Sequence, residues 1–458
     1  MKDGKTMKFH DIYQNVFFRF LDLLRGRKTI SRLKYLRQSQ HWDRDHLERW
    51  QLERLNALLY QARNYSPYYA NTLSGNVLPL KSLSEIQDLP ILRKENIRNN
   101  LETIRCANIP GKRLELSRTG GSTGEPTRYY LDKKGMDWNR GTVYRSAEWA
   151  GAFLGESTMQ MTGSHYDLDE FDKLKWKVIF FLQRYFDCPV AMVNDEILRK
   201  YYLKMLQRKP TSIWGYASGI FLFSLFIERN YPGANLDFIR CLITSSETLL
   251  PHQREKIEHV FGEGKVYDHY GSREMYLASE CKAHDGYHIH SEVILLEVVD
   301  EDGRWKKPGE LVGILVTDLS NEAFPFMRYE IGDVGMILPT DSACSCGVTL
   351  PRLGKVEGRI ADVVTLRDRM LTVPNFATML SDVPGVAAYQ IVQDALDELV
   401  LNIVKGADFT DKTESYLKYA MGQLCGDISV RIDYKDEIEV PKSGKRRYVI
   451  SSVAKSYL

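Results

Sequence analysis

The sequence predicts an α/β protein with a large N-terminal domain of mixed sheets and helices and a small α+β C-terminal domain. Apolar residues recur at three- and four-residue spacings within residues 1–105, which indicates a helical N-terminal segment. Strand-like and helix-like segments alternate over residues 111–340, as is typical of α/β architectures. The pattern then changes to a short α+β unit. We therefore expect two domains, residues 1–361 and 362–458.

The individual elements follow from periodicity and turn signals. A helix is expected over residues 47–63, where leucines recur at helical spacing until Ser66-Pro67 breaks the pattern. Further expected helices are 196–207, 251–261 and 411–423. Expected strands are 213–216, 238–245, 265–269, 386–393 and 398–404, and runs 291–300 and 309–318 are expected to form a hairpin.

Composition excludes several classes of protein. The 458 residues include 62 basic and 60 acidic side chains and give a formal net charge of +2, so no global charge favours nucleic acid as a partner. Seven cysteines in a long chain do not resemble the disulfide framework of a small secreted domain. We expect a cytoplasmic protein with free or metal-bound thiols. The cysteines expected in the core are Cys106, Cys188, Cys241 and Cys425.

The N-terminal apolar run, residues 16–24, is interrupted by Arg19 and Asp22. It is too short and too charged to span a membrane. Four apolar side chains share one face of the expected helix: Phe17, Phe18, Leu21 and Leu24. We expect this face to pack against the protein. Peripheral contact with a membrane surface is the alternative.

A loop rich in glycine and hydroxyl side chains covers residues 117–127. Glycines let backbone N–H groups approach an anion, and hydroxyls add donors to phosphate oxygens. The loop lacks the Gly-Lys-Ser/Thr ending of kinase and GTPase loops, and it lacks the Gly-x-Gly-x-x-Gly dinucleotide fingerprint. The sequence therefore indicates a phosphate-binding loop of another kind.

Four motifs follow this loop along the chain: YDHYGSRE at 267–274, RYEIGD at 328–333, GRIAD at 358–362 and PKSGK at 441–445. In this order, the set resembles the adenylate-forming superfamily of acyl-CoA synthetases, nonribosomal-peptide adenylation domains and luciferases. The chain is most similar to the phenylacetate–CoA ligase branch, including its capsule-associated CapK-type members. Segments 55–69, 89–94, 344–347 and 350–352 carry this closer resemblance.

The resemblance implies that the protein uses ATP and Mg²⁺ to activate a carboxylic acid as an acyl-AMP. The reaction brings two anions together, so donors and cations must screen charge. The resemblance places the β- and γ-phosphates of ATP against Thr119, Gly121, Ser122, Thr123 and Gly124. Many family members carry lysine where this chain has Glu125, and Arg128 is a candidate replacement for that cation.

The resemblance also implies the remaining roles in the site. The implied catalytic residues are Lys445, which stabilises charge at the α-phosphate, Glu274, which binds Mg²⁺, and Arg359, which holds ribose or phosphate. The remaining nucleotide-binding residues are Tyr270 and Gly271 against the adenine, Asp333 on the ribose hydroxyls, and Ser246 and Glu247 in a turn near the adenine. Trp214 and Tyr216, two apart on one face of an expected strand, are candidate walls of the substrate pocket.

The sequence does not determine which molecule accepts the acyl group. Phenylacetate–CoA ligases use the thiol of coenzyme A, CapK-type relatives suggest an amine or sugar in polysaccharide biosynthesis, and other relatives adenylylate a deazaflavin coenzyme. In the superfamily the small C-terminal domain rotates between the two steps about a position matched by Asp362, so that Lys445 serves the first. A non-catalytic nucleotide-binding relative is the alternative from another class. The sequence leaves the acid and the oligomeric state undefined.

A candidate zinc site comes from cysteine and histidine spacing. Cys344 and Cys346 form a C-x-C-G motif, and Cys281 stands upstream beside His284 and His288. Three thiols and one imidazole suit a closed tetrahedral zinc site with a structural role. We expect Cys281, His288, Cys344 and Cys346 as the ligands, with His284 as the second candidate for the histidine.

Overall fold

The structure is a computed structural model of the whole chain. It describes residues 9–118, 127–162, 178, 180–190, 194–300, 302–339, 343–359, 364–366, 370–371, 376, 379–380, 383–426, 428–439 and 447–453.

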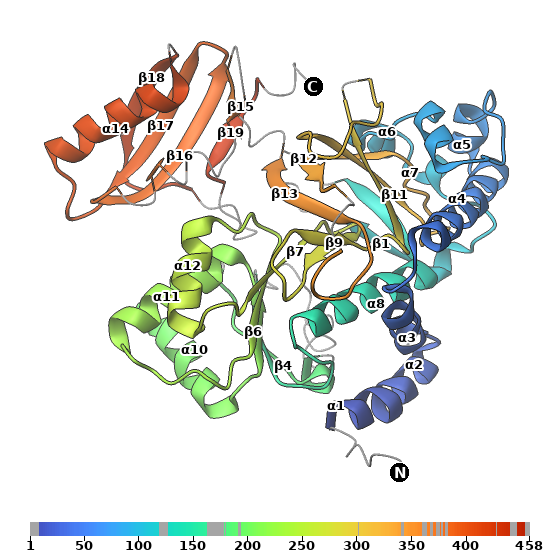
Figure 1. Cartoon of the computed structure of the whole chain (residues 1–458), viewed down its shortest axis with the longest axis horizontal. Helices are drawn as coiled ribbons and strands as arrows, with labels where there is room; N and C mark the ends of the chain where they lie inside the picture. The colour runs from blue at the N-terminus through green and yellow to red at the C-terminus, as the bar shows by residue number, and fades with distance from the viewer. Residues whose placement is uncertain are drawn as a thin grey trace.

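A mixed sheet forms the centre of the described residues (Figure 1). In spatial order its strands are β10 (Ile294–Val299), β11 (Val312–Asp318), β12 (Tyr329–Ile337), β13 (Arg352–Arg359), β9 (Tyr287–Ile289), β8 (Tyr276–Glu280), β7 (Val266–Gly271), β6 (Cys241–Ser245), β5 (Ser212–Gly215), β3 (Thr158–Met161) and β4 (Tyr185–Asp187). Strands β4, β3, β5, β6 and β7 run parallel, and the other neighbours are antiparallel. The parallel strands read as apolar runs because helices cover both of their faces.

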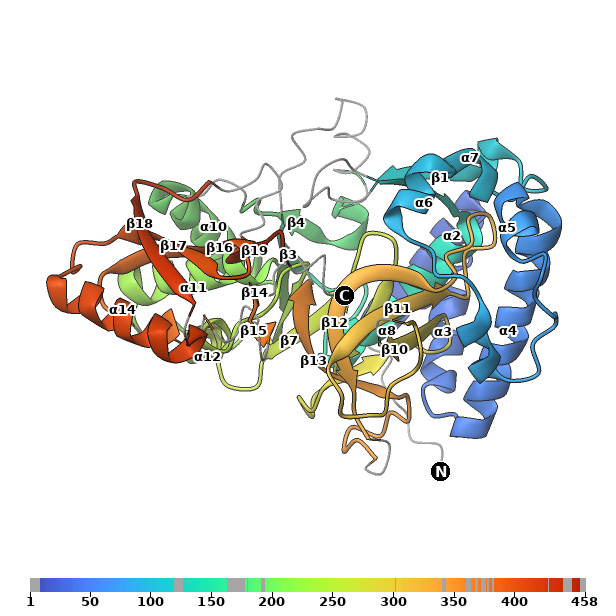
Figure 2. The ribbon, with the colours of Figure 1, turned by 90° about the horizontal axis from the view of Figure 1, so that it is seen from above.

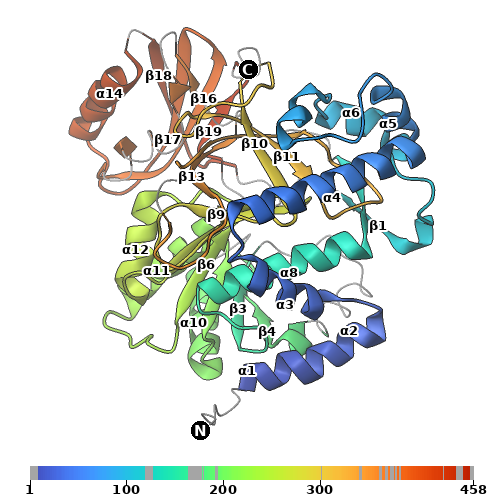
Figure 3. The same cartoon turned by 45° about the vertical axis from the view of Figure 1, so that its right-hand side comes forward.

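Helices lie on both sides of the parallel strands. On one side are α10 (Asp195–Arg208), α11 (Ala217–Asn230) and α12 (Pro251–Phe261), whose apolar side chains share a core with β5, β6 and β7. On the other side Ala147 of α8 (Lys133–Trp149) packs against Ile243 and Tyr267, together with Ala150 and Ala152, which follow the helix. Figure 3 shows α8 next to α3 (Thr29–Ser39).

The N-terminal segment is helical, as expected. Its long helix α4 (Arg44–Tyr65) begins at Asp43, whose side chain accepts from the backbone N–H of His46, and it contains the expected 47–63. Ser66 then caps α5 (Pro67–Thr72), with Pro67 in the first helical position. The other elements here are η2 (Leu83–Asp88), α6 (Lys94–Asn99), α7 (Leu101–Ile104), η3 (Gly111–Arg113), and the hairpin β1 (Leu114–Arg118) and β2 (Arg128–Asp132).

One expectation for the N-terminus is wrong. The helix consists of α1 (Phe9–Ile12), η1 (Tyr13–Phe18) and α2 (Arg19–Arg25), and Leu24 is 68% exposed rather than packed with Phe18. The segment η1 is a π-helix, which has more residues per turn than an α-helix and therefore shifts the phase of the apolar face. Among the described residues, no helix is both long enough and apolar enough to cross a membrane.

The C-terminal residues form a separate α+β unit with its own core (Figures 1 and 2). Its sheet has the order β18 (Ser429–Lys435), β17 (Glu398–Lys405), β16 (Val386–Ala395), β19 (Val449–Ser451), with α14 (Asp411–Cys425) packed beside it and a small pair, β14 (Val364–Thr365) and β15 (Met370–Leu371). Leu250, at the start of α12, joins this core.

The predicted fold class is confirmed, and the predicted hairpin is confirmed as strands β10 and β11. The boundary at 361 falls outside the described residues.

Candidate functional site

The parallel strands end at one edge of the sheet, where ligands of open α/β sheets bind. Gly215 ends β5, and a Cβ on it would lie 2.3 Å from the carbonyl oxygen of Met161 at the end of β3. Ser246 follows β6 in the left-handed region, at φ 70°. The backbone at this edge is therefore tightly constrained, as a preorganised site requires.

Tyr270 and Asp333 meet across two strands of this region. The Tyr270 hydroxyl donates to Asp333 Oδ2 at 2.7 Å, and this bond fixes both the ring at the end of β7 and the carboxylate on β12. Gly271 follows, and a Cβ there would lie 3.0 Å from the carbonyl oxygen of Met275. The predicted adenine-binding and ribose-binding residues are thus neighbours, although they stand far apart in the sequence.

Glu274 lies in the short turn between β7 and β8 and is only 5% exposed. The Tyr329 hydroxyl donates to Glu274 Oε1 at 3.3 Å. Burial raises the pKa of Tyr129, and the Glu274 carboxylate raises it further, so Tyr129 also stands near this carboxylate. Because Tyr129 belongs to β2, the strand that follows the glycine-rich loop, Glu274 lies beside the structural base of that loop.

The structure holds the ends of the predicted phosphate loop together. Strands β1 and β2 pair antiparallel, with Arg118 opposite Arg128. Residues 119–126 lie between them and outside the described residues, together with Thr119, Gly121, Ser122, Thr123 and Gly124. Lys445 also lies outside them. Of Arg359 the backbone is described, and it pairs with Asp333 between β13 and β12.

Two further predicted groups have structural contacts that the sequence does not reveal. Glu247 Oε2 accepts from the backbone N–H of Ser218 at 2.9 Å, so this carboxylate satisfies an N–H in the first turn of α11. Trp214 and Tyr216 do not share a face as expected. Strand β5 ends at Gly215, so Trp214 packs on the α8 side of the sheet and Tyr216 packs with the helices of the opposite side.

The four predicted zinc ligands come together at the ends of β8, β9 and the segment before β13. Their ligand atoms all lie within 4.8 Å of one another. Cys281 Sγ lies 3.6 Å from Cys344 Sγ, and His288 Nε2 lies 3.2 Å from Cys346 Sγ. Zinc–sulfur bonds of about 2.3 Å place tetrahedral sulfurs about 3.8 Å apart. The donor set and its spacing therefore fit zinc.

The surroundings hold these groups in a ligating geometry. His288 Nδ1 donates to the Leu350 carbonyl at 3.1 Å, which directs Nε2 toward the thiols. Gly347 adopts φ 87°, as the turn after Cys346 requires. His41 Nδ1 donates to the Gly347 carbonyl at 2.9 Å, so the end of α3 supports the cysteine loop. His284 instead contacts Glu280 and the Gly264 carbonyl and lies outside the cluster.

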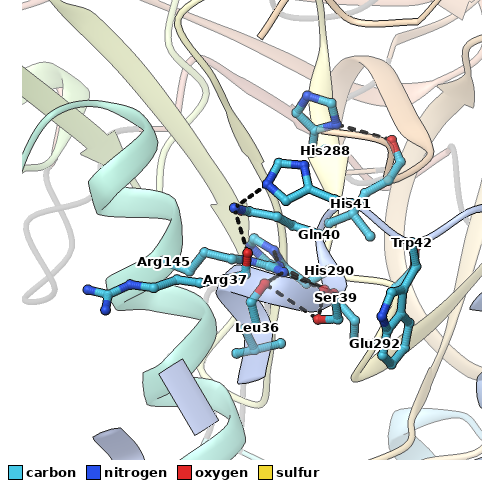
Figure 4. A network of polar contacts seen from close by, with 12 residues as sticks. Leu36, Arg37, Ser39, Gln40, His41, Trp42, Arg145, His288, His290 and Glu292 are labelled. Carbon is cyan, nitrogen blue, oxygen red and sulfur yellow. Dashed lines mark hydrogen bonds and ion pairs between the residues drawn. The ribbon is translucent and has the colours of Figure 1, made fainter. Parts of the chain in front are cut away.

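A buried polar network lies beside this cluster (Figure 4). Arg145 and Glu292 form an ion pair with side chains 1% and 0% exposed. Arg145 Nη2 donates to His290 Nδ1 at 3.0 Å, and Ser39 Oγ donates to Glu292 Oε1 at 2.7 Å. The network fastens α3 and α8 to the segment after β9. Sequence inspection missed it, because no local pattern marks partners so distant in the chain.

A second buried ion pair orients the strand that carries Asp333. Arg328 pairs with Glu297, with side chains 2% and 0% exposed, and donates to the carbonyls of Gln87 and Leu89 at 2.9 Å each. Its backbone lies in the left-handed region, at φ 46°. The arginine that opens the RYEIGD motif is therefore structural, and it sets the start of β12.

Comparisons with known proteins agree with this geometry. Residues 363–452 match the family model of the CapK C-terminal domain. The phenylacetate-coenzyme A ligase of Thermus thermophilus is 25% identical over 414 residues, which cover 86% of this chain and 87% of that protein. That of Pseudomonas putida is 24% identical over 430 residues, covering 90% and 87%.

Solved structures show the same fold. The 2-hydroxyisobutyryl-CoA ligase in its postadenylation state, in complex with R3-HIB-AMP, superimposes with a TM-score of 0.73 at 20% identity and covers 92% of this chain and 93% of that one. The same ligase in its thioesterification state gives 0.61 at 19% identity, with the same coverage. The chain is therefore similar to phenylacetate-coenzyme A ligases along most of its length, has the fold of 2-hydroxyisobutyryl-CoA ligase, and ends in a segment that matches the CapK C-terminal domain.

Proposed function

We propose that this protein is an ATP-dependent ligase that converts a carboxylic acid to an acyl-AMP and then transfers the acyl group to the thiol of coenzyme A. The observation that carries the proposal is the hydrogen bond between Tyr270 of β7 and Asp333 of β12, with buried Glu274 held in the turn after β7 by Tyr329 of β12. The named relatives are phenylacetate-coenzyme A ligases.

The first step joins a carboxylate oxygen to the α-phosphorus of ATP and breaks the bond to pyrophosphate. Asp333 would accept hydrogen bonds from the ribose hydroxyls and so fix the nucleoside beside Tyr270. Buried Glu274 is a hard anionic ligand, and Mg²⁺ bound there would neutralise charge on the phosphates. The backbone of Arg359 pairs with that of Asp333 between β13 and β12, and Arg359 is proposed to bind the ribose or a phosphate. Lys445 is proposed for the α-phosphate.

In the second step the coenzyme A thiolate attacks the acyl carbonyl, and AMP leaves. The CapK-type C-terminal domain favours a second candidate acceptor, an amine or sugar in polysaccharide biosynthesis. The two candidates use the same first step and differ in the nucleophile that enters after it.

Hydroxylamine trapping tests the proposal. Purified protein is incubated with ATP, Mg²⁺ and one acid at a time, and hydroxamate and pyrophosphate are measured. We expect acid-dependent release of both, and consumption of the acyl-AMP when coenzyme A replaces hydroxylamine. If amines or amino sugars consume the acyl-AMP and coenzyme A does not, the second candidate is correct. Release of neither product with any acid, in a protein that binds ATP, would contradict the ligase proposal.

We also propose that Cys281, His288, Cys344 and Cys346 hold a structural zinc ion. Four protein ligands leave no open position for chemistry, and the two cysteines of the loop before β13 would then be tied to β8 and β9.

Metal analysis of the protein is expected to give about one zinc per chain. Cys344→Ser should lose most of the zinc and lower the melting temperature, because the buried thiols then lack their ion. His284→Gln is the matched control and should keep the metal, since His284 lies outside the cluster. Wild-type protein without zinc after growth in zinc-supplemented medium would refute the site.

A further inference from the structure

A cation on α8 has no anionic partner among the described residues. Arg140 lies on α8, and no described carboxylate forms an ion pair with it. Three tyrosines lie near enough to influence its charge, namely Tyr144, one helical turn along α8, Tyr185 and Tyr276. Burial lowers the pKa of Arg140, but the hydrogen-bonded Tyr144 and the other two hydroxyls outweigh this and leave the pKa raised. The side chain is nevertheless open to solvent. An exposed guanidinium with no described carboxylate partner is therefore available to an anion from solution.

The tyrosines are held in place from three elements. Gln183 Nε2 donates to the Tyr144 hydroxyl at 3.0 Å. The backbone N–H of Tyr276 donates to Asn139 Oδ1 at 3.4 Å, which ties β8 to the residue preceding Arg140. Tyr185 lies on β4, and burial together with the nearby Tyr144 raises its pKa. The tyrosine hydroxyls near Arg140 are therefore held in place by contacts with the surrounding elements.

This cluster adjoins the candidate nucleotide site. Tyr276 is the strand partner of Gly271, which directly follows Tyr270. On the side of β7 that α8 covers, His269 is 3% exposed, and neither of its ring nitrogens has a hydrogen-bond partner. Its ring meets Trp214 edge-on at 5.2 Å on the side that α8 covers. A buried polar group without a partner is costly, and a polar ligand would satisfy it.

We infer that the acid activated by this protein carries a second anionic group, a carboxylate or a phosphate, which binds Arg140 and the nearby tyrosine hydroxyls. A planar guanidinium binds either anion through two parallel hydrogen bonds, and the hydroxyls add donors. The inference rests on the proposed ligase function and names its substrate class. The reacting carboxylate is directed to the nucleotide, and the second anion lies at the other end of the acid.

Matched acid pairs test the inference: hexanoate and adipate, octanoate and suberate, phenylacetate and 4-carboxyphenylacetate, glycerate and 3-phosphoglycerate. The value of kcat/KM for acid-dependent pyrophosphate release is measured in wild type, Arg140→Gln, Arg140→Lys and the exposed control Arg199→Gln. At least one doubly anionic acid should exceed its partner by about tenfold or more in wild type. Arg140→Gln should abolish this preference, Arg140→Lys should retain part of it, and Arg199→Gln should leave it unchanged. A preference within the first three pairs would identify the second anion as a carboxylate. A preference within the last pair would identify it as a phosphate.

The inference would be overturned if, in every pair, the acid without a second anionic group had the same kcat/KM as its doubly anionic partner. The ligase function would remain intact in that case. A preference that survives Arg140→Gln would do the same. If no acid releases pyrophosphate although ATP binds, the ligase function itself fails, and the substrate inference fails with it.

A different observation concerns the outer face of the N-terminal helix. Apolar side chains there are exposed: Phe9 57%, Ile12 44%, Val16 63%, Phe20 57%, Leu23 73% and Leu24 68%. A distant segment extends the patch with Val178 at 48% and Phe181 at 81%. The two segments touch, because Tyr13 donates to the Leu182 carbonyl and the Arg184 guanidinium lies 5.1 Å from the centre of the Phe9 ring. Figure 1 shows α1 at the edge of the molecule, near β4.

Among the described residues, the exposed charges around this patch are basic. Arg19, Arg25, Lys28 and Arg184 are exposed. The acidic side chains on the helix are already engaged, since Asp11 pairs with His10 and Asp22 accepts from the backbone N–H of Ile30. The geometry points to an anionic phospholipid surface as the partner, with the apolar side chains entering the headgroup boundary and the cations binding the headgroups.

Vesicle co-sedimentation tests this partner with the full chain. The protein should bind vesicles of phosphatidylcholine and phosphatidylglycerol, bind less at high salt, and bind phosphatidylcholine alone weakly. Phe20→Ser/Leu23→Ser should lose most of the binding, while Val77→Ser, at another side chain that is 82% exposed, should not. Absence of binding to anionic vesicles would overturn the proposal. A wild-type dimer that the double substitution converts to a monomer would identify the patch as an interface between copies instead.

Discussion

Replacing Glu274 by glutamine is expected to lower kcat/KM for acyl-AMP formation by about 10²- to 10³-fold, the usual effect of removing one preorganised charge that stabilises a transition state. Glutamine preserves the volume and can still accept from the Tyr329 hydroxyl, so the fold should be retained. The proposed Mg²⁺ ligand is lost, however, and the requirement for Mg²⁺ should rise. Pyrophosphate release across a Mg²⁺ titration measures both effects.

Glu310→Gln is the matched control, because this carboxylate is exposed and pairs with Lys306 on the surface. Its activity should equal that of wild type. If Glu274→Gln keeps more than about a fifth of wild-type activity at every Mg²⁺ concentration, Glu274 does not bind the catalytic metal, since a tenfold loss already corresponds to only about 1.4 kcal/mol.

Arg145→Met is expected to reduce the free energy of unfolding by about 3–5 kcal/mol, because it leaves the Glu292 carboxylate buried without its partner. Such a loss is a large part of the stability of an ordinary domain. The contacts of Arg145 with the Leu36 carbonyl and His290 are lost as well, so the anchoring of α3 and α8 should weaken. Urea unfolding followed by far-ultraviolet circular dichroism measures the change.

The exposed ion pair of Arg229 and Asp195 provides the comparison, with side chains 62% and 69% exposed. Arg229→Met should cost less than about 1 kcal/mol. Arg145→Met combined with Glu292→Gln should cost less than the sum of the two single substitutions, because the second removes the stranded charge. A loss below about 1 kcal/mol for Arg145→Met would show that the network does not support the fold.

Much of the fold was accessible from the sequence, because its elements are strongly periodic and sharply bounded. The helix over 47–63 and the strand pair around 301–303 have clear turn signals, and the structure confirms both. The ordered motifs led to the same relatives that the comparisons find, and two of their residues, Tyr270 and Glu274, do stand at the end of β7 and in the turn after it. The convergence of Cys281 and His288 on the C-x-C loop was also predicted, and the four side chains do lie together.

The remaining features depend on tertiary contacts that leave no local pattern. The π-helical turn changes the exposed face of the N-terminal helix, so an α-helical projection misplaces Leu24. Gly215 ends β5 one residue earlier than expected, which separates Trp214 from Tyr216. The arginines at 145 and 328 find their carboxylates 147 and 31 residues away, and an arginine in a motif or a helix gives no indication that it will be buried.

The central claim is that this protein forms an acyl-AMP, and acid-dependent exchange of labelled pyrophosphate into ATP tests it most directly. The exchange reports the first step alone and requires no acceptor. We predict exchange that depends on both Mg²⁺ and a carboxylic acid, that is strongly reduced in Glu274→Gln and that is unchanged in Glu310→Gln. Wild-type protein that binds ATP and Mg²⁺ but catalyses no exchange with any of the paired acids would contradict the account.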